Sequence, residues 1–349
     1  MNIAQDLQGG GAYESALGRL HDRLPTMQQT DTDPPSPAPP PWGPFMYRPF
    51  EQRIPDGQYR DLLLRILTSG EEVVTEHGVA ALKVIGHAMR FPLANGFPVI
   101  TERDVAIEQN KKRPSPFHQA IGEICAFLNG AQTQQELEQF GCFWWDRWVT
   151  AEHCEEFGLA PGDLGPGSYG AAFRRFPTAG GVPFDQVRHL IDQIKTRPAA
   201  RHHELSPWIP NFVLATNGGR RRVVVPPCHG WVHVHVNTGT GELTLTHRQR
   251  SADVPVGLAF NLIHYAAFAL MIGQVTGYRP KELVYWIDDA HIYLNQIEDV
   301  QAMLATKPQR FPTVHVDPDI TDIFAFRYHH FAVTDYYPRL PRRRIPTPV

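Results

Sequence analysis

The sequence predicts an α+β protein in which helices pack on one large mixed β-sheet. Two kinds of pattern predict it. Residues 229–251 alternate apolar and polar side chains, as in VHVHV and LTLTH, which is typical of strands. Residues 59–70 have the apolar spacing of an amphipathic helix, and residues 257–278 form a longer apolar run typical of a buried helix. Because each element buries its apolar side only against another element, strands and helices are expected to share one core.

In the first part of the chain, glycine, serine and proline mark the limits of the expected elements. Gly70 stops the first helix, while Ser115 and Gly130 bound a second helix as its N-cap and its end. Pro198 closes a third helix. The expected elements are a helix over 59–70, a strand over 79–93, a short strand over 97–101, and helices over 115–130 and 184–198.

The second part of the chain is expected to supply most of the sheet. A glycine-rich turn at residues 238–241 joins two alternating segments. The expected elements are strands over 211–217, 221–227, 229–237 and 241–251, a long buried helix over 257–278, and a surface helix over 291–305.

The N-terminal segment differs in composition from the rest. Residues 28–44 read QQTDTDPPSPAPPPWGP and are too polar and proline-rich to bury a core. We therefore expect a flexible Pro-rich extension over residues 1–49 and one folded domain over residues 50–349.

Overall composition narrows the function classes. The 349 residues are 42% hydrophobic and 20% charged, and the net charge of −3 favours neither nucleic acid nor an anionic membrane as partner. The four cysteines lack CxxC spacing, so neither a disulfide framework nor a zinc site is expected. The N-terminus lacks a signal-peptide pattern, and the apolar run at 265–273 is too short to span a bilayer. These features predict a cytoplasmic protein.

One cysteine lies in a setting suited to nucleophilic chemistry. Cys228 follows Pro226 and Pro227, with Arg250 and Asn261 downstream. A thiolate needs a positive, pre-organised pocket, and a planar amide can recognise the edge of a pyrimidine.

Several segments in a fixed order extend this observation into a resemblance. They are GHAMRF, IGEICAFLNG, FWWDRW, LGPGSYGAAFR, PPCH, QRSAD, GLAFN and DDAHIYLN. Together they resemble the thymidylate synthase family over roughly residues 59–338. The resemblance implies that family's fold, a sheet-mediated homodimer, and one-carbon transfer from 5,10-methylenetetrahydrofolate to C5 of a pyrimidine nucleoside monophosphate.

The resemblance also implies roles for individual residues. The catalytic residues would be Cys228 as nucleophile at C6, Glu123 for proton transfer, Tyr169 near the C5 proton, Arg250 beside thiolate and phosphate, and Asp253. The substrate-binding residues would be Arg201, His229, Gln249, Ser251, Asn261, His291 and Tyr293, with Arg201 reaching the partner's site. The cofactor-binding residues would be Trp145, Asp253, Gly257 and Tyr336, and no metal is implied.

The chain departs from the family where the phosphate and the folate are bound. Glu76 and His202 stand where the family has arginines, which leaves Arg201 and Arg250, with residues 220–222 as substitute bases. A carboxylate facing a dianion is repulsive. The C-terminus reads RRRIPTPV rather than the family's APVAV-like tail, and ICA follows Glu123 in place of a bulkier sequence.

Four readings remain open from the sequence. Methylation of dUMP is the leading one, because Asn261 suits the N3–H and O4 of uracil. Hydroxymethylation of a pyrimidine nucleotide, as in DNA modification or nucleoside-antibiotic pathways, would fit the altered folate region. A catalytically silent relative that binds nucleotide or RNA is the third reading. A metal site on His229, His233 and His235, which have period-two spacing, is the fourth.

Overall fold

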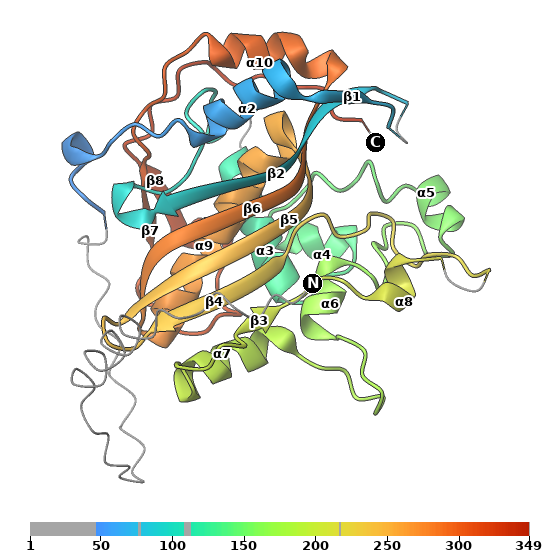
Figure 1. Ribbon diagram of the computed structural model, residues 1–349. Helices are drawn as coiled ribbons and strands as arrows, with labels where there is room; N and C mark the ends of the chain where they lie inside the picture. Colours follow the sequence, from blue (N-terminus) through green and yellow to red (C-terminus); the bar gives the residue numbers. More distant parts are fainter. Residues whose placement is uncertain (1–46, 76–77, 108–112, 216–217, 349) are drawn as a thin grey trace, which may run out of the picture. The chain divides into compact units, whose positions relative to one another are not determined.

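The computed structural model describes residues 47–75, 78–107, 113–215 and 218–348 (Figure 1). Residues 1–46 of the expected extension and Glu76 lie outside the described residues. Within them, six strands form one mixed sheet in the order β1-β2-β6-β5-β4-β3. The strands are β1 (Glu71–Val73), β2 (Ala81–Pro92), β3 (Glu204–Leu205), β4 (Trp231–Asn237), β5 (Glu242–Asp253) and β6 (Arg279–Tyr293).

The centre of the sheet is a parallel pair, and the other neighbours are antiparallel. β5 and β6 run parallel, with Asp253 opposite His291 and Ser251 opposite Asp289. Parallel neighbours need a long crossover connection, which α9 (Ala259–Thr276) supplies here. The parallel register brings the chemistry-bearing ends of β5 and β6 to the same edge of the sheet.

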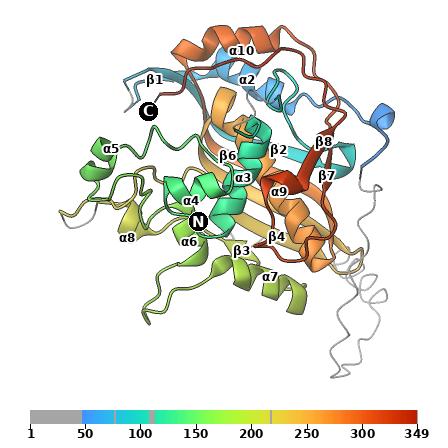
Figure 2. The same cartoon turned by 180° about the vertical axis from the view of Figure 1, so that it is seen from behind.

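The helices gather on one face of this sheet. Seen in Figure 1 the sheet lies in front of α3 and α9, and in Figure 2, from behind, these helices lie in front of it. The remaining regular elements include a small hairpin, β7 (Thr313–Val316) with β8 (Phe331–Thr334). The helices are α2 (Gln58–Ser69), α3 (Pro116–Leu128), α4 (Gln134–Gln139), α5 (Ala151–Glu156), α6 (Tyr169–Arg174), α7 (Gln186–Thr196), α8 (Pro210–Val213), α9 and α10 (Ile297–Leu304).

α9 is the central helix of the core. Its side chains are apolar nearly all the way round, as expected for a helix buried on every side. The stretch Val254–Thr276 is long and apolar enough to cross a membrane, but 83% of it is buried inside the protein. The expectation that no apolar segment reaches that length is therefore wrong, and the burial of the helix accounts for its composition.

The two faces of the sheet differ sharply in exposure. On the inner face, Leu245, Tyr285 and Ile287 are fully buried against the helices. The outer face, defined here by Ile85, Ala88, Trp231, Arg248 and Trp286, is partly or wholly exposed. Its register aligns Ala88, Trp286, Arg248 and Trp231 across four strands. Among the described elements, no helix covers these residues.

The expected helices and several strands are confirmed. Helices occur at 58–69, 116–128, 186–196 and 259–276, and strands occur at 81–92, 231–237 and 242–253. At α3 the backbone N–H of His118 donates to Ser115 Oγ at 3.3 Å, as the N-cap prediction requires. Gly130 has φ of 86°, the left-handed conformation of a residue that follows a helix.

Other expected elements are wrong. Residues 97–101 and 221–227 form no strand, and residues 210–213 form one helical turn. A strand at residues 221–227 would have to pair with the edge of β4, but β3 already pairs there. Pro226 and Pro227 also have no backbone N–H to donate to a neighbouring strand. The expected helix over 291–305 begins only at Ile297, because residues 279–293 continue as β6, the longest strand.

Candidate active site

Cys228 lies in the loop that leads into β4, held by the facing end of β5. Its carbonyl oxygen accepts the backbone N–H of Arg250 at 2.7 Å. The Arg250 guanidinium folds back over the same loop, so that its NH2 group lies 3.5 Å from Cys228 Sγ. The guanidinium also contacts the carbonyl oxygens of Pro226 and Pro227 at 3.5 and 3.3 Å. The sequence expectation that Arg250 stands beside the thiol is thus met by direct contact.

The pKa of the Cys228 thiol reflects two opposed effects. Burial raises it above its usual value, the positive charge of Arg250 lowers it, and the carboxylate of Asp289 adds a smaller rise. Burial outweighs Arg250, so the thiol is held mainly protonated at neutral pH. Of these three contributions, only the positive charge of Arg250 favours the thiolate.

Tyr169 and His229 form an aromatic stack beneath the cysteine. The backbone N–H of Cys228 donates to the Tyr169 hydroxyl oxygen at 2.8 Å. The ring of Tyr169 stacks with those of His229 and Phe127, at centroid distances of 4.4 and 4.7 Å. His229 Nδ1 is 2.5 Å from the Tyr265 hydroxyl, and burial together with His264 holds the pKa of His229 well below its usual value. His229 is therefore a neutral group of the site.

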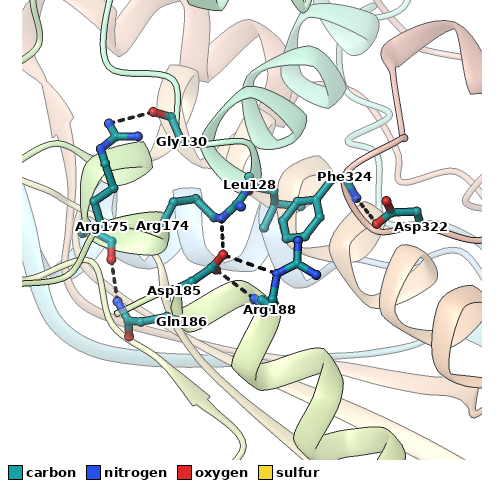
Figure 3. A network of polar contacts seen from close by, with 10 residues as sticks. Leu128, Gly130, Arg174, Arg175, Asp185, Gln186, Arg188, Asp322 and Phe324 are labelled. Carbon is teal, nitrogen blue, oxygen red and sulfur yellow. Dashed lines mark hydrogen bonds and ion pairs between the residues drawn. The ribbon is translucent and has the colours of Figure 1, made fainter. Parts of the chain in front are cut away.

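The short helix that begins with Tyr169 is tied to its neighbours by arginines (Figure 3). At the end of α6, Arg174 donates to Leu128 O at 3.1 Å and pairs with Asp185 at 2.9 Å. Its guanidinium also lies 3.9 Å from the ring centroid of Phe324. Asp185 is the N-cap of α7, so this ion pair joins α3, α6 and α7. The arrangement fixes Tyr169 by fixing the far end of its helix.

Glu123 lies on the buried face of α3, where the carboxylate is surrounded by nitrogen groups. One oxygen, Oε1, accepts from the indole N–H of Trp144 at 3.0 Å and from that of Trp145. The other, Oε2, is 2.9 Å from Nε2 of His264, whose N–H direction falls outside hydrogen-bond geometry. A buried carboxylate is costly without such partners. Trp145, expected beside the folate, is thus bonded to the catalytic candidate itself.

A second polar chain runs through Asn261 on α9. Asn261 Oδ1 accepts from Gln249 Nε2 at 2.9 Å, and its Nδ2 is 3.3 Å from His264 Nδ1. Gln249 Oε1 in turn accepts from the hydroxyl of Tyr285. A Cβ added to Gly257 would lie 3.8 Å from Asn261 Oδ1, so this glycine leaves the approach to the amide open. The expected residues Gln249, Gly257 and Asn261 therefore lie together.

Asp253 forms the third group with the end of β6. Gln296 Nε2 donates to both oxygens of Asp253, at 3.2 and 3.1 Å, and also to Pro346 O at 2.8 Å. Burial raises the pKa of Asp253 to about 6, although His291 and Gln296 oppose that rise. Burial also raises the pKa of Tyr293 to about 12, with smaller contributions from the nearby Asp253 and Cys228.

His291 and Ser251 lie at the same edge of the sheet, near the ends of β6 and β5. His291 Nδ1 is 2.9 Å from Asp289 Oδ1, which holds His291 on the Asp253 side of β6. Ser251 presents its backbone N–H to Cys228 O at 3.4 Å. The ends of β5 and β6 therefore bring Ser251, Asp253, His291 and Tyr293 to the cysteine loop, as the resemblance implies.

Other expected site residues do not join this group. Arg201 is exposed, and its carbonyl oxygen is 3.1 Å from His233 on the outer side of β4. The Tyr336 hydroxyl is taken up by backbone groups of Ile100, Arg103 and Val105. The arginines suggested as substitute phosphate ligands turn elsewhere: Arg220 binds the carbonyl oxygens of Glu155 and Glu156, and Arg221 and Arg222 lie on phenylalanine rings.

The three histidines of the alternative metal reading do not converge. The tilted rings of His233 and His235 lie 4.2 Å apart, centroid to centroid, on the outer side of β4. His229 precedes the strand and is buried against Tyr169 and Tyr265. Across residues 47–75, 78–107, 113–215 and 218–348, no cluster of three or more potential ligands could hold a metal ion.

Three residues of the site were missed from the sequence. Trp144 shares Glu123 Oε1 with its neighbour, His264 links Glu123 to Asn261, and Gln296 links Asp253 to the C-terminal segment. A signal existed for His264, which is the lone histidine in the apolar run of α9 and lies one turn after Asn261. No spacing rule pointed to Gln296, because its partners are distant in sequence.

The fold and the polar groups gathered around Cys228 are those of a class of transferase. A family model described as thymidylate synthase matches residues 57–347, which includes every strand of the sheet and every helix from α2 to α10. The chain belongs to the thymidylate synthase family. The match confirms both the resemblance and the α+β fold expected from the sequence. Proteins of this family carry out one-carbon transfer to C5 of a pyrimidine nucleotide with methylenetetrahydrofolate as co-substrate.

Proposed function

We propose that this protein methylates dUMP at C5, using 5,10-methylenetetrahydrofolate and a covalent bond between Cys228 and C6 of the base. The observation that carries the proposal is the 3.5 Å contact between Arg250 and Sγ of Cys228, both of which are half-buried residues. A guanidinium at that distance stabilises the thiolate that must form. The same group can bind a phosphate oxygen through its second N–H.

The proton transfers fall to groups that already hold hydrogen bonds around the cysteine. Addition of Cys228 Sγ at C6 places negative charge on the ring carbonyl, and Glu123 relays a proton there. Tyr169, with its oxygen 2.8 Å from the Cys228 N–H, lies where it can assist removal of the C5 proton. The folate would supply the one-carbon unit that bonds to C5 and the hydride that completes the methyl group, and it would leave as dihydrofolate. Loss of the C5 proton follows formation of the new C–C bond, and expulsion of the Cys228 thiolate then restores the C5–C6 double bond.

Substrate recognition is assigned to the remaining groups of the site. Asn261, supported by Gln249, pairs with the edge of the base, while His229 and Ser251 line the cysteine side. His291 and Tyr293 bind the sugar hydroxyl. The folate supplies the one-carbon unit, and Asp253, Trp145 and Gly257 are its proposed contacts. The buried carboxylate of Asp253 suits the pterin because it can accept ring N–H groups.

A homodimer formed through the outer face is part of the proposal. Trp286 is 44% exposed and Ile85 66% exposed, on a sheet face that no described helix covers. Exposed apolar surface of this kind favours association. Arg201 lies beside this face, next to His233, and from there we propose that it reaches the phosphate in the partner's site. Arg250 and the partner's Arg201 would then share the phosphate that Glu76 and His202 do not bind.

Product analysis tests the reaction directly. The purified protein is incubated with methylenetetrahydrofolate and, separately, dUMP, dCMP, UMP or CMP, and the products are identified by mass spectrometry. A methylated base together with dihydrofolate supports the proposal. A hydroxymethylated base with tetrahydrofolate would instead make this a hydroxymethylase, the alternative suited to nucleotide modification. The absence of any adduct would favour a silent relative that only binds nucleotide.

Two controls accompany that experiment. Cys228→Ala is expected to abolish product formation while leaving the circular dichroism spectrum and unfolding midpoint close to those of the wild type. Retained turnover in this variant would contradict the covalent mechanism. Sedimentation of wild type and Trp286→Glu tests the dimer, since a charge in a buried interface is expected to shift the protein toward monomer. A wild-type monomer would contradict the shared phosphate site and leave the cysteine chemistry standing.

A further inference from the structure

We infer that His264 holds the side-chain amide of Asn261 in one of its two orientations and thereby sets which pyrimidine the site accepts. The inference rests on the proposed function, in which Asn261 reads the base. His264 is fully buried on α9, one turn after Asn261, and touches both Asn261 and Glu123. It acts through Asn261 and is therefore a positioning residue.

A chain of donors and acceptors fixes the direction of each amide. The Tyr285 hydroxyl donates to Gln249 Oε1, so Gln249 turns its Nε2 toward Asn261. Gln249 Nε2 also donates to Ser251 O at 2.9 Å, which reinforces this orientation. Asn261 must then present Oδ1 to Gln249 and Nδ2 to His264.

The same chain fixes the tautomer of His264. Its Nδ1 faces Asn261 Nδ2, a donor, at 3.3 Å and so must be the unprotonated nitrogen. The imidazole proton is therefore on Nε2, which lies 2.9 Å from the carboxylate of Glu123. A proton on Nδ1 instead would make it a donor facing the donor group Nδ2 of Asn261, which would favour the reversed orientation of the Asn261 amide.

The orientation of Asn261 matters because uracil and cytosine present opposite patterns. Uracil offers a donor at N3 and an acceptor at C4, whereas cytosine offers an acceptor at N3 and a donor at C4. An amide held in one orientation matches one base and sets donor against donor, or acceptor against acceptor, with the other. A site built to hydrogen-bond one pattern rejects the wrong one strongly, because buried groups are left unpaired.

A simpler role for His264 is packing in the apolar core of α9. Packing alone would make substitutions lower stability and reduce activity with every nucleotide to the same degree. The ratio of kcat/KM for the preferred base over the other base removes any such common loss. That ratio is therefore the quantity to measure.

Three variants and a packing control carry the test. His264→Leu removes both nitrogens and is expected to lower the ratio of kcat/KM for dUMP over dCMP by at least about tenfold. His264→Gln keeps an acceptor for Asn261 Nδ2 and should retain the ratio within about threefold. Tyr285→Phe removes the hydroxyl that orients Gln249 and should lower the ratio like His264→Leu, which covers the case in which that variant does not fold. Met271→Leu, two turns further along α9, should leave the ratio unchanged.

A ratio that stays at the wild-type value in both His264→Leu and Tyr285→Phe would overturn the inference. If the wild type turns over no nucleotide, the proposed reaction fails, and the ratio of dissociation constants for dUMP and dCMP replaces the kinetic ratio, with the same expected changes.

The tautomer gives a test that needs neither turnover nor nucleotide. In ¹⁵N-histidine-labelled protein, with the His264 signals assigned by their loss in His264→Gln, a proton on Nε2 and none on Nδ1 supports the inference. A proton on Nδ1 would overturn it, whatever the enzyme is found to catalyse.

Discussion

The backbone N–H of Cys228 donates a hydrogen bond to the phenolic oxygen of Tyr169 at a distance of 2.8 Å. The phenol thus serves as an acceptor for the loop that carries the thiol, and its own proton is left for another partner. Tyr169 starts α6, whose far end is tied to α3 and α7 through Arg174. The position of the thiol therefore depends on a helix more than fifty residues earlier in the chain.

Removing this hydroxyl should affect both stability and turnover. Tyr169→Phe keeps the ring stacked on His229 but leaves the Cys228 N–H without its acceptor, which is expected to cost about 1–3 kcal/mol in the free energy of unfolding. The proposed assistance with the C5 proton predicts a fall in kcat of about 10²-fold or more. Urea unfolding and steady-state kinetics measure the two effects.

Tyr278→Phe is the matched control, because Tyr278 is only half-buried and lies at the far end of α9. Its effect on unfolding should stay within about 0.5 kcal/mol. A Tyr169→Phe variant as stable and as active as this control would show that the hydrogen bond to Cys228 is incidental.

The reactivity of Cys228 should depend on Arg250. Burial raises the thiol pKa and Arg250 lowers it, so Arg250→Gln should raise the pKa further and move the alkylation profile to higher pH. At neutral pH the rate of alkylation by iodoacetamide is expected to drop by about tenfold, and Arg250→Lys should recover part of it. The measurement is the alkylation rate at Cys228 as a function of pH. A profile that stays in place in Arg250→Gln would mean that the guanidinium does not act on the thiol.

The sequence motifs supplied candidate site residues that the fold brings together, whereas they predicted the sheet only in part. Short polar motifs have characteristic order, so Cys228, Arg250 and Asn261 could be named from residue type alone. β6 was missed because its segment LVYWI at residues 283–287 is apolar on both faces, although Trp286 is exposed, and because its polar end at residues 288–291 resembles a loop. Conversely, residues 221–227 have strand propensity, but in the folded protein β3 pairs with the edge strand β4 in their place.

Contacts between segments distant in the sequence could not be predicted from any motif. His264 and Trp144 become partners of Glu123 only when α9, α3 and the loop at 143–148 meet. The link from Gln296 to Pro346 depends on where the C-terminal segment runs. Sequence patterns encode local periodicity and reaction chemistry, whereas these contacts follow from packing.

The pH dependence of stability should carry the signature of Asp253. Its folded pKa of about 6 lies above the ordinary aspartate value, so the folded state binds a proton more tightly than the unfolded state. Stability from this group is therefore present at low pH and is lost as the pH rises from about 4 to about 6. Asp253→Asn has no ionisable group at this position and therefore does not lose stability in this way. The free energy of unfolding of the variant, relative to that of the wild type, should therefore increase by about 1–2 kcal/mol between about pH 4.5 and pH 8.

Asp289→Asn gives the control of opposite sign. Burial would raise the pKa of Asp289, but His291 and Lys83 outweigh it and lower the pKa. Its stabilising contribution is present above its ordinary pKa and is lost only as the pH falls through the lowered folded value. The variant should therefore be destabilised about equally at both pH values. The same flat profile for Asp253→Asn would contradict the raised pKa of Asp253.

Gln296 should hold the C-terminal segment against the site. One amide group donates to both oxygens of Asp253 and to Pro346 O, so Gln296→Ala releases the segment and leaves a buried carboxylate with fewer donors. Residues 342–344 are arginines, and local opening should expose them to trypsin several-fold faster than in the wild type. Gln301→Ala, an exposed change on α10, is the control and should leave the rate alone. Because Arg343 also pairs with Asp299 at 2.6 Å, an unchanged rate in Gln296→Ala would mean that this ion pair alone secures the segment.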